Sequence, residues 1–367
     1  MTSQRISDAS SVRLRAFPVQ LLSAEGGVVL VRGVAEIFVA GDRSTELVPA
    51  LLAAIPDEGL SRDDLIERFA APDREEIGKL IDELVGRSIL APVTGESPVG
   101  PVESNLDVFY WHFGQSARTT IDKMSAKPIV LIGVNTISRR IAQSLRSIGV
   151  ENVEVVDFPI LRNLRLHGDD GKLLEKEWPM PAPVSYEAWS EKLGTQDFAC
   201  IVATSDFGGP FLMREWNSFC VQQGIHFLPV ILNRFTGTIG PLVIPGETAC
   251  YECLRLRENA NMDAPEMERV AEFSAQERQS VTGFHPAMTG ILGELASMEL
   301  CKIYGGGIPW RSNYLIEVNL LGPAILTRRV LKLPLCPVCS PALKTSSVYL
   351  DKESFVPGHQ LNFHEFR

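Results

Sequence analysis

The alternation of strand-like and helix-like segments from residue 128 onward constrains the fold more than any other feature of the sequence. Short apolar runs such as PIVLIG, VEVVD and ACIVATSD are separated by segments whose apolar residues recur at helical spacing. This alternation is typical of a doubly wound, mostly parallel sheet covered by helices. We therefore predict an α/β domain over residues 106–345, with residues 106–124 as a helical lead-in that packs on it.

Residues 1–92 have a different pattern, which predicts a smaller domain of its own. Glycines interrupt short β-branched runs between residues 17 and 42, which indicates a meander of strands. Three helical patterns follow, at 45–55, at 61–70 with Ser61 as N-cap and Asp64 as its partner, and at 73–90. Strands followed by three helices are typical of a winged-helix-like module. Residues 93–105, rich in Pro, Gly and Ser, are interpreted as a linker, and residues 346–367 as a C-terminal tail.

The segment LIGVNTISRRIAQSLRSIG, residues 131–149, has the outline of a nucleotide-binding strand, turn and helix. Such a turn normally contains several glycines, because the backbone must approach phosphate closely and donate its N–H groups at the start of the helix. Here only Gly133 is present, and larger residues occupy positions 134–137. Their side chains would fill the space that phosphate needs, so we predict that this chain does not bind ATP and Mg²⁺.

Four of the seven cysteines form two C-x-x-C pairs, Cys250 with Cys253 and Cys336 with Cys339. Two such pairs supply the four thiolates of a tetrahedral zinc site. Because a Cys₄ site leaves no position for water, the predicted zinc is structural, and we assign no catalytic residue. The alternative is that these cysteines are buried or redox-active thiols.

Composition narrows the class of partner. The chain is 45% hydrophobic and carries a formal net charge of −10. An acidic surface disfavours binding to nucleic acid or anionic lipid, since both require clustered Lys and Arg. We find no basic-then-apolar leader and no apolar run near the roughly 20 residues that span a bilayer, so we expect a cytoplasmic protein without membrane contact.

The order of segments over residues 128–341 resembles the ThiF/MoeB-like, ubiquitin-activating superfamily, most specifically in PGETACYECL and the distal cysteine pair. Members with intact motifs bind ATP, adenylate a carboxylate and form homodimers. The resemblance places the ribose-binding acid at Asp157, a phosphate contact at Asn163 and the magnesium-binding acid at Asp206. Together with Gly133 we interpret these residues as a vestigial nucleotide site. Asp157 and Asp206 could equally be ordinary acids at strand ends.

The N-terminal module resembles the PqqD-like recognition elements that bind leader peptides in ribosomal-peptide modification systems. A peptide could add as a strand beside VAEIFVAG and pack apolar side chains against the third helix. The residues that this implies are Val34, Ala35, Glu36, Ile37, Phe38, Val39, Ile77, Leu80, Ile81 and Leu84. DNA binding is the competing interpretation, but the acidic third helix would repel phosphate. A docking domain without a ligand is the remaining alternative.

Both parts together resemble the ocin-ThiF-like partner proteins of azole-forming cyclodehydratases. In those systems a separate YcaO protein uses ATP to cyclise Cys, Ser or Thr residues of a precursor peptide, and the partner presents the peptide. We therefore expect a substrate-recognition subunit that is non-catalytic or weakly catalytic on its own. The second hypothesis is an ATP-dependent peptide-adenylating enzyme of the MccB type, and the third is a winged-helix transcription factor.

Overall fold

The computed structural model describes residues 12–56, 58–87, 89–93, 105–113, 115–193, 195–263, 267, 270, 284–304 and 313–340. The chain divides into two compact units, Met1–Ala117 and Arg118–Arg367. The expected linker, apart from residues 93 and 105, and the expected tail 346–367 lie outside the described residues. Residues 106–117, which we expected in the larger domain, group with the first unit.

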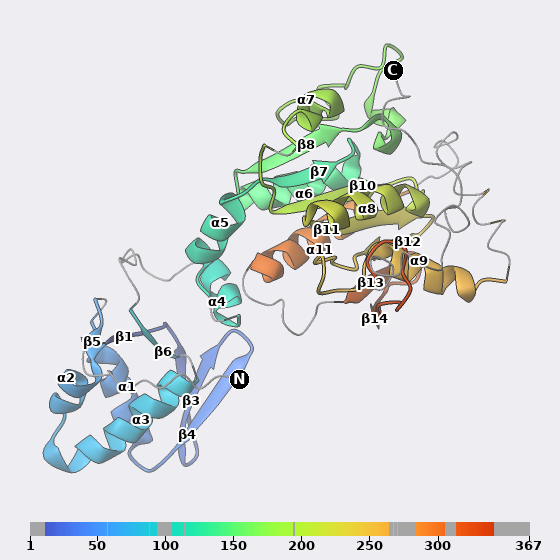
Figure 1. The fold of residues 1–367 in the computed structure, drawn as a ribbon. Coiled ribbons are helices and arrows are strands. Elements are labelled where there is room, and N and C mark those ends of the chain that lie inside the picture. The colour runs from blue at the N-terminus through green and yellow to red at the C-terminus, as the bar shows by residue number, and fades with distance from the viewer. Residues whose placement is uncertain are drawn as a thin grey trace. The chain divides into compact units, whose positions relative to one another are not determined.

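Over its described residues, the first unit contains two small antiparallel sheets and four α-helices (Figure 1). One sheet has the order β5-β1-β6 and the other the order β2-β3-β4. The strands are β1 (Arg13–Ala16), β2 (Gln20–Ala24), β3 (Gly27–Arg32), β4 (Ala35–Ala40), β5 (Leu60–Ser61) and β6 (Leu90–Pro92). The helices are α1 (Ser44–Ala53), α2 (Arg62–Glu67), α3 (Arg74–Gly86) and α4 (Asn105–Trp111).

Local sequence accounts for most of these elements. Ser61 caps α2 by accepting a hydrogen bond from the Asp64 amide at 3.1 Å, as predicted, while its hydroxyl donates to the Asp64 carboxylate at 2.6 Å. The apolar residues of α3 recur at helical spacing and pack into the core of the unit with residues of α1 and β3. The expected meander is the sheet β2-β3-β4.

The aromatic lead-in differs from its prediction. Trp111 of α4 is 8% exposed and packs against the core of the first unit. The guanidinium of Arg32 lies 5.2 Å from the centre of the Trp111 ring and 4.9 Å from that of Phe17. These cation–π contacts connect α4 to the end of β3.

The second unit is built on one mixed eight-stranded sheet of order β14-β13-β12-β11-β10-β7-β8-β9. The strands are β7 (Ile129–Ile132), β8 (Val153–Asp157), β9 (Val184–Ser185), β10 (Cys200–Ser205), β11 (His226–Asn233), β12 (Thr236–Ile239), β13 (Tyr314–Asn319) and β14 (Ala324–Arg329). The α-helices are α5 (Ala117–Ser125), α6 (Thr136–Ser147), α7 (Tyr186–Ser190), α8 (Met213–Gln223), α9 (Tyr251–Ala260) and α11 (Pro286–Lys302).

Pairing within this sheet changes from parallel to antiparallel. Strands β9, β8, β7, β10 and β11 pair in parallel, whereas β12, β13 and β14 add in antiparallel fashion. The chain leaves β7 towards β8 on one side and reaches β10 on the other, so β7 and β10 flank a topological switch point. In open α/β sheets, ligand sites lie at the carboxyl ends of strands at such a point.

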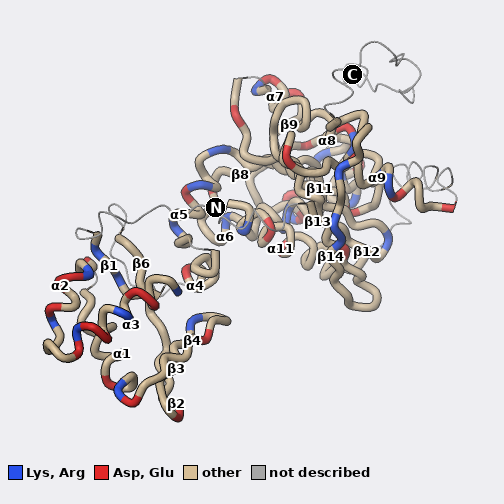
Figure 2. The backbone as a smooth tube through the Cα atoms, turned by 60° about the horizontal axis from the view of Figure 1, so that its bottom comes forward, with Lys and Arg blue, Asp and Glu red and all other residues tan. Residues whose placement is uncertain are grey.

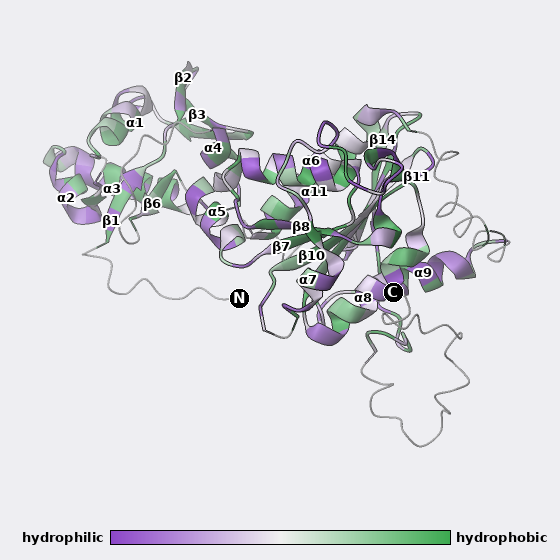
Figure 3. Ribbon diagram, turned by 90° about the horizontal axis from the view of Figure 1, so that it is seen from above, coloured by the Kyte–Doolittle hydropathy of each residue, from purple (hydrophilic) through white to green (hydrophobic). Residues whose placement is uncertain are grey.

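Helices cover both faces of the large sheet, as predicted for a doubly wound domain. Helices α6 and α11 lie on one face, and α7 and α8 lie on the other (Figures 1 and 3). The second face packs large aromatic residues, including Trp189 and Trp216, against buried strand residues such as Ile132 and Ile201. Among the described residues, no helix combines the length and apolar character needed to cross a bilayer.

Candidate functional site

The turn after β7 lies at the switch point, and its helix begins with an internal cap. Gly133 has a φ of 102°, a left-handed conformation that favours glycine. Asn135 is fully buried, and its side-chain oxygen accepts hydrogen bonds from the amides of Ile137 at 3.1 Å and Ser138 at 3.0 Å. Its side-chain nitrogen donates to the Thr204 carbonyl at 2.9 Å, which joins the turn to β10. Two of the first helical amides are therefore already bonded.

The amide of Thr136, the first residue of α6, is bonded to an acid that follows the neighbouring strand β10. Asp206, immediately after β10, accepts hydrogen bonds through Oδ2 from the Thr136 amide at 2.9 Å and the Thr136 hydroxyl at 2.5 Å. The same oxygen accepts a hydrogen bond from the Asn163 side chain at 2.9 Å. Two of the residues that we assigned to a vestigial nucleotide site, Asn163 and Asp206, are therefore in direct contact.

Burial makes the Asp206 carboxylate unusual. The residue is 1% exposed, and within the described structure its Oδ1 has no hydrogen-bond partner. Burial raises the pKa of Asp206, and the hydrogen bonds from Thr136 and Asn163 only partly oppose that effect.

The segment after β8 packs directly on the turn after β7. The Asn163 amide donates to the Val134 carbonyl at 2.9 Å, and Leu161, which is fully buried, packs on Gly133. A Cβ atom at Gly133 would lie only 2.9 Å from the Leu161 Cβ. The space above the turn is thus filled by this chain. We expected bulky groups at 134–137 to do this, but Val134 and Ile137 are themselves buried, and Leu161 is the residue that covers Gly133.

Asp157, the fourth residue of the expected site, lies at the end of β8 and pairs with its own chain. Arg162 donates to both carboxylate oxygens, from Nε at 2.5 Å and from Nη2 at 2.7 Å. This bidentate pair raises the pKa of Arg162. The structure therefore brings together the four residues around one loop, each with an internal contact.

The two cysteine pairs form one cluster, in agreement with the sequence. The sulfur atoms of Cys250, Cys253, Cys336 and Cys339 all lie within 4.8 Å of one another. The sulfur–sulfur separations are 3.6 Å for Cys250–Cys336, 3.5 Å for Cys253–Cys339 and 3.9 Å for Cys250–Cys253. Zinc–sulfur bonds of about 2.3 Å in a tetrahedron place sulfurs about 3.8 Å apart, so the cluster fits a bound metal ion.

The surroundings of the cluster also suit a cation. Hydrogen bonds to Cys253 and Cys336, together with burial, raise the pKa of Cys250, and a bound cation would favour its thiolate form. Cys250 and Cys253 lie at the start of α9, whereas Cys336 and Cys339 follow β14. The Leu333 amide donates to the Cys253 sulfur at 3.4 Å. A metal here would tie the segment after β14 to α9.

The expected peptide-binding strand is an edge strand of its sheet. β4 pairs with β3 on one side only, and it has no partner on the other side among the described residues. Val34 in the preceding turn is 89% exposed, and Phe38 on the strand is 51% exposed. Ile37 is buried at 7%, while Ala35 and Val39 are half-buried and Glu36 is exposed.

The four helical residues that we assigned to peptide binding are placed differently from that expectation. Ile77, Ile81 and Leu84 are fully buried and Leu80 is 8% exposed, all within the core of the first unit. Because these side chains already pack against their own module, they offer little surface to a peptide. The resemblance implied a binding role for these residues, but their spacing is that of a core-facing helix.

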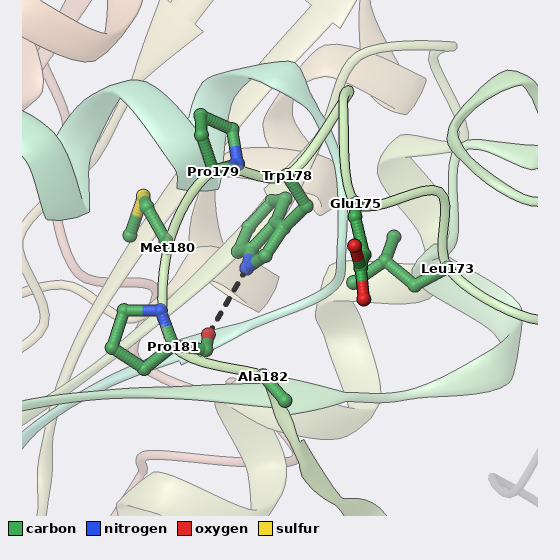
Figure 4. A pocket seen from close by; sticks show the side chains of 7 residues that line it. All are labelled: Leu173, Glu175, Trp178, Pro179, Met180, Pro181 and Ala182. Atoms are coloured by element: carbon green, nitrogen blue, oxygen red, sulfur yellow. Dashed lines mark hydrogen bonds between the residues drawn. The ribbon is translucent and has the colours of Figure 1, made fainter.

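A pocket in the second unit was not predicted from sequence. The loop 173–182 surrounds a largely apolar cavity of about 710 Å³ (Figure 4). Trp178 stands at its wall, and its indole N–H donates to the Pro181 carbonyl at 3.2 Å. Arg139 of α6 donates to the Glu177 carbonyl, which anchors this loop to the capped helix. The proline-rich run WPMPAPV was the available signal.

Comparison with known proteins supports the fold. No protein-family model and no curated protein matches the sequence. Among solved structures, Escherichia coli MccB with AMPCPP and MccA has a TM-score of 0.61 at 17% identity, over 89% of this chain and 100% of that one. A heterocyclase in complex with substrate and cofactor has a TM-score of 0.56 at 16% identity, and the heterocyclase TruD has 0.58 at 17%.

The coverage differs between these two kinds of protein. The matches to the heterocyclases include 90% of this chain but only 40% and 43% of theirs, so those proteins extend well beyond the shared region. At these identities the likeness concerns the fold. The chain therefore combines an α/β unit folded like those of MccB and the heterocyclases with four cysteines arranged to hold a metal ion.

Proposed function

We propose that this chain binds the leader of a ribosomally made precursor peptide and presents that peptide to a separate YcaO-type cyclodehydratase. The partner would close Cys, Ser or Thr side chains onto the preceding carbonyl to form azolines. We take the structurally similar heterocyclases as the model for this proposal. The region that they share with this chain is less than half of their length. We propose that the YcaO-type partner corresponds to part of the heterocyclase chain outside the matched region. The homodimer expected from the resemblance stays a prediction.

The internal hydrogen bonds at the start of α6 are the main support for our proposal that this chain does not itself use ATP. The amides of Thr136, Ile137 and Ser138, which would face a phosphate, are bonded to Asp206 and Asn135. Binding a triphosphate would require breaking these hydrogen bonds and moving Leu161 off Gly133. A buried donor or acceptor left unpaired costs about 1–3 kcal/mol, so the internal cap competes with nucleotide.

The four cysteines would hold a structural zinc ion. Their sulfur separations fit a closed Cys₄ site, which leaves no position for water. Zinc would then stabilise the second unit without taking part in a reaction.

A calorimetric titration of the full chain with ATP and Mg²⁺ tests the proposal. We expect no binding, whereas MccB, whose solved complex contains AMPCPP, serves as the positive control. A pyrophosphate-exchange assay in the presence of a bound peptide should also show no exchange. Reconstitution with a YcaO-type protein and its precursor peptide should increase ring formation, detected by mass spectrometry as the loss of water.

Peptide adenylation in the manner of MccB is the second candidate function. The observation that favours it is coverage, because this chain matches MccB over that protein's entire length. Measurable ATP binding together with peptide-dependent pyrophosphate exchange would support this candidate and overturn the first one.

A further inference from the structure

The β3–β4 hairpin determines which groups of β4 face its free edge. Gly33, with a φ of 59°, and Val34 form a two-residue turn between the paired residues Arg32 and Ala35. Residues that flank such a turn form a hydrogen-bonded pair, and such pairs alternate along an antiparallel ladder. The backbone groups of Ala35, Ile37 and Val39 therefore face β3. Those of Glu36 and Phe38 face the open edge.

The side chains of the same two residues lie on the outer face of the sheet. Side chains alternate between the faces of a strand, and the intervening Ile37 is buried in the core. Phe38 pairs across the ladder with Val29, which in turn pairs with Leu22 of β2. Phe38 and Leu22 are 51% and 43% exposed, so an apolar row crosses the outer face and ends at the free edge.

Glu36 adds a charge to this edge, two residues from Phe38 on the same face. It is exposed, and among the described residues it makes no ion pair. A like charge directly opposite it on a neighbouring strand would be destabilising.

We infer that β4 selects its peptide by sequence: an apolar side chain opposite Phe38 and, two residues away, a side chain other than Asp or Glu opposite Glu36. This inference rests on the proposed function, in which an extended peptide is the occupant of the edge. The open backbone groups would give affinity without sequence preference, and the two outward side chains would provide the selection. Cross-strand partners on one face lie about 5 Å apart, close enough for both contacts.

Selection from a displayed library tests this directly. The full chain would be immobilised and offered random peptides about ten residues long, enough to span the six residues of β4. We expect enriched peptides to share an apolar residue two positions from a site depleted of acidic residues. Glu36→Lys should reverse the charge preference, so that acidic residues become enriched at that position.

Substitutions at Phe38 and Leu22 show whether the peptide binds at the β4 edge or at the β2 edge of the sheet. Phe38→Ser should weaken binding of a selected peptide by about fivefold, whereas Leu22→Ser, on the far edge, should leave it unchanged. Both side chains are substantially exposed, and thermal melting would verify that both variants fold.

The possible outcomes separate a failure of the proposed function from a failure of this inference alone. If wild-type chain enriches no peptide at all, the proposed function fails and this inference with it. If peptides are enriched but Glu36→Lys leaves their charge pattern unchanged, or Phe38→Ser leaves their affinity unchanged, only the inference fails. A larger effect of Leu22→Ser than of Phe38→Ser would assign the peptide to β2 and would also overturn it.

Discussion

Asp206 is the residue that most clearly links the candidate site to stability. One of its oxygens receives three hydrogen bonds, from the Thr136 amide, the Thr136 hydroxyl and the Asn163 side chain. The carboxyl group is nevertheless buried, and burial raises its pKa above the ordinary value of 3.8. Folding therefore shifts the ionisation equilibrium of Asp206 towards its protonated form.

The sign of the pH effect follows from that shift. A raised pKa in the folded chain contributes stability below the unfolded pKa, and this contribution is lost as the pH rises through the folded pKa. Asp206→Asn keeps an acceptor oxygen but cannot ionise. We expect it to raise the free energy of unfolding at about pH 8 by on the order of 1 kcal/mol relative to wild type, and by less at about pH 4.5.

Urea denaturation at the two pH values measures this effect. Asp169→Asn, which removes an exposed acid from the same unit, is the matched control and should show no pH-dependent gain. A loss of stability in Asp206→Asn at both pH values would instead indicate that the negative charge itself is required.

At the scale of elements, the pairing of α6 with α11 depends on one close approach. Gly293 of α11 lies against Arg140 of α6, and a Cβ atom at position 293 would come within 2.6 Å of the Arg140 Cβ. Gly290, one turn earlier, has no neighbour within 4 Å of such an atom. The same substitution should therefore have opposite effects at the two positions.

We expect Gly293→Ala to lower the free energy of unfolding by about 1–3 kcal/mol, because the helices must separate or rotate to accept the methyl group. Gly290→Ala should raise it by about 0.5–1 kcal/mol through helix propensity. Equilibrium denaturation of both variants would show the contrast. A Gly293→Ala variant as stable as Gly290→Ala would mean that the α6–α11 contact accepts a methyl group without adjustment.

At the scale of the whole molecule, the two units differ in charge and in which of them contains the cysteine cluster. Residues 1–117 contain 18 acidic and 10 basic side chains, a net charge of −8 out of the −10 of the chain. Acidic residues recur along the helices of this unit (Figure 2). Such a charge argues against a nucleic-acid ligand for the module. The cysteine cluster, by contrast, belongs entirely to the second unit.

Metal removal should therefore affect one unit only. We expect about one zinc ion per chain by elemental analysis and two transitions by scanning calorimetry. A chelator or Cys336→Ser should lower the melting temperature of one transition by several degrees, at about 2–4 °C per kcal/mol for a unit of this size. Leu84→Ala, in the core of the first unit, should lower the other. A chelator that shifts neither transition would exclude a structural metal.

Much of this architecture could be predicted from near neighbours in the sequence. The alternation after residue 128 predicted a doubly wound sheet, the apolar spacing of residues 73–90 predicted the helix α3, and two C-x-x-C pairs predicted one cluster. Each of these depends on periodicity or on spacing of a few residues. The same local patterns did not reveal that Ile77, Leu80, Ile81 and Leu84 are occupied by their own core.

Only the tertiary structure decided how the helix start at Thr136 is capped. Asn135 contacts Thr204 69 residues further along the chain, and Asp206 reaches Thr136 across 70 residues. These contacts exist because β7 and β10 are neighbours in the sheet, which no local pattern specifies. The sequence alone determined the types of element and the four cysteines that could hold a metal ion, since those follow from local chemistry. The order of the strands determined which side chains bond the amides that a phosphate would need.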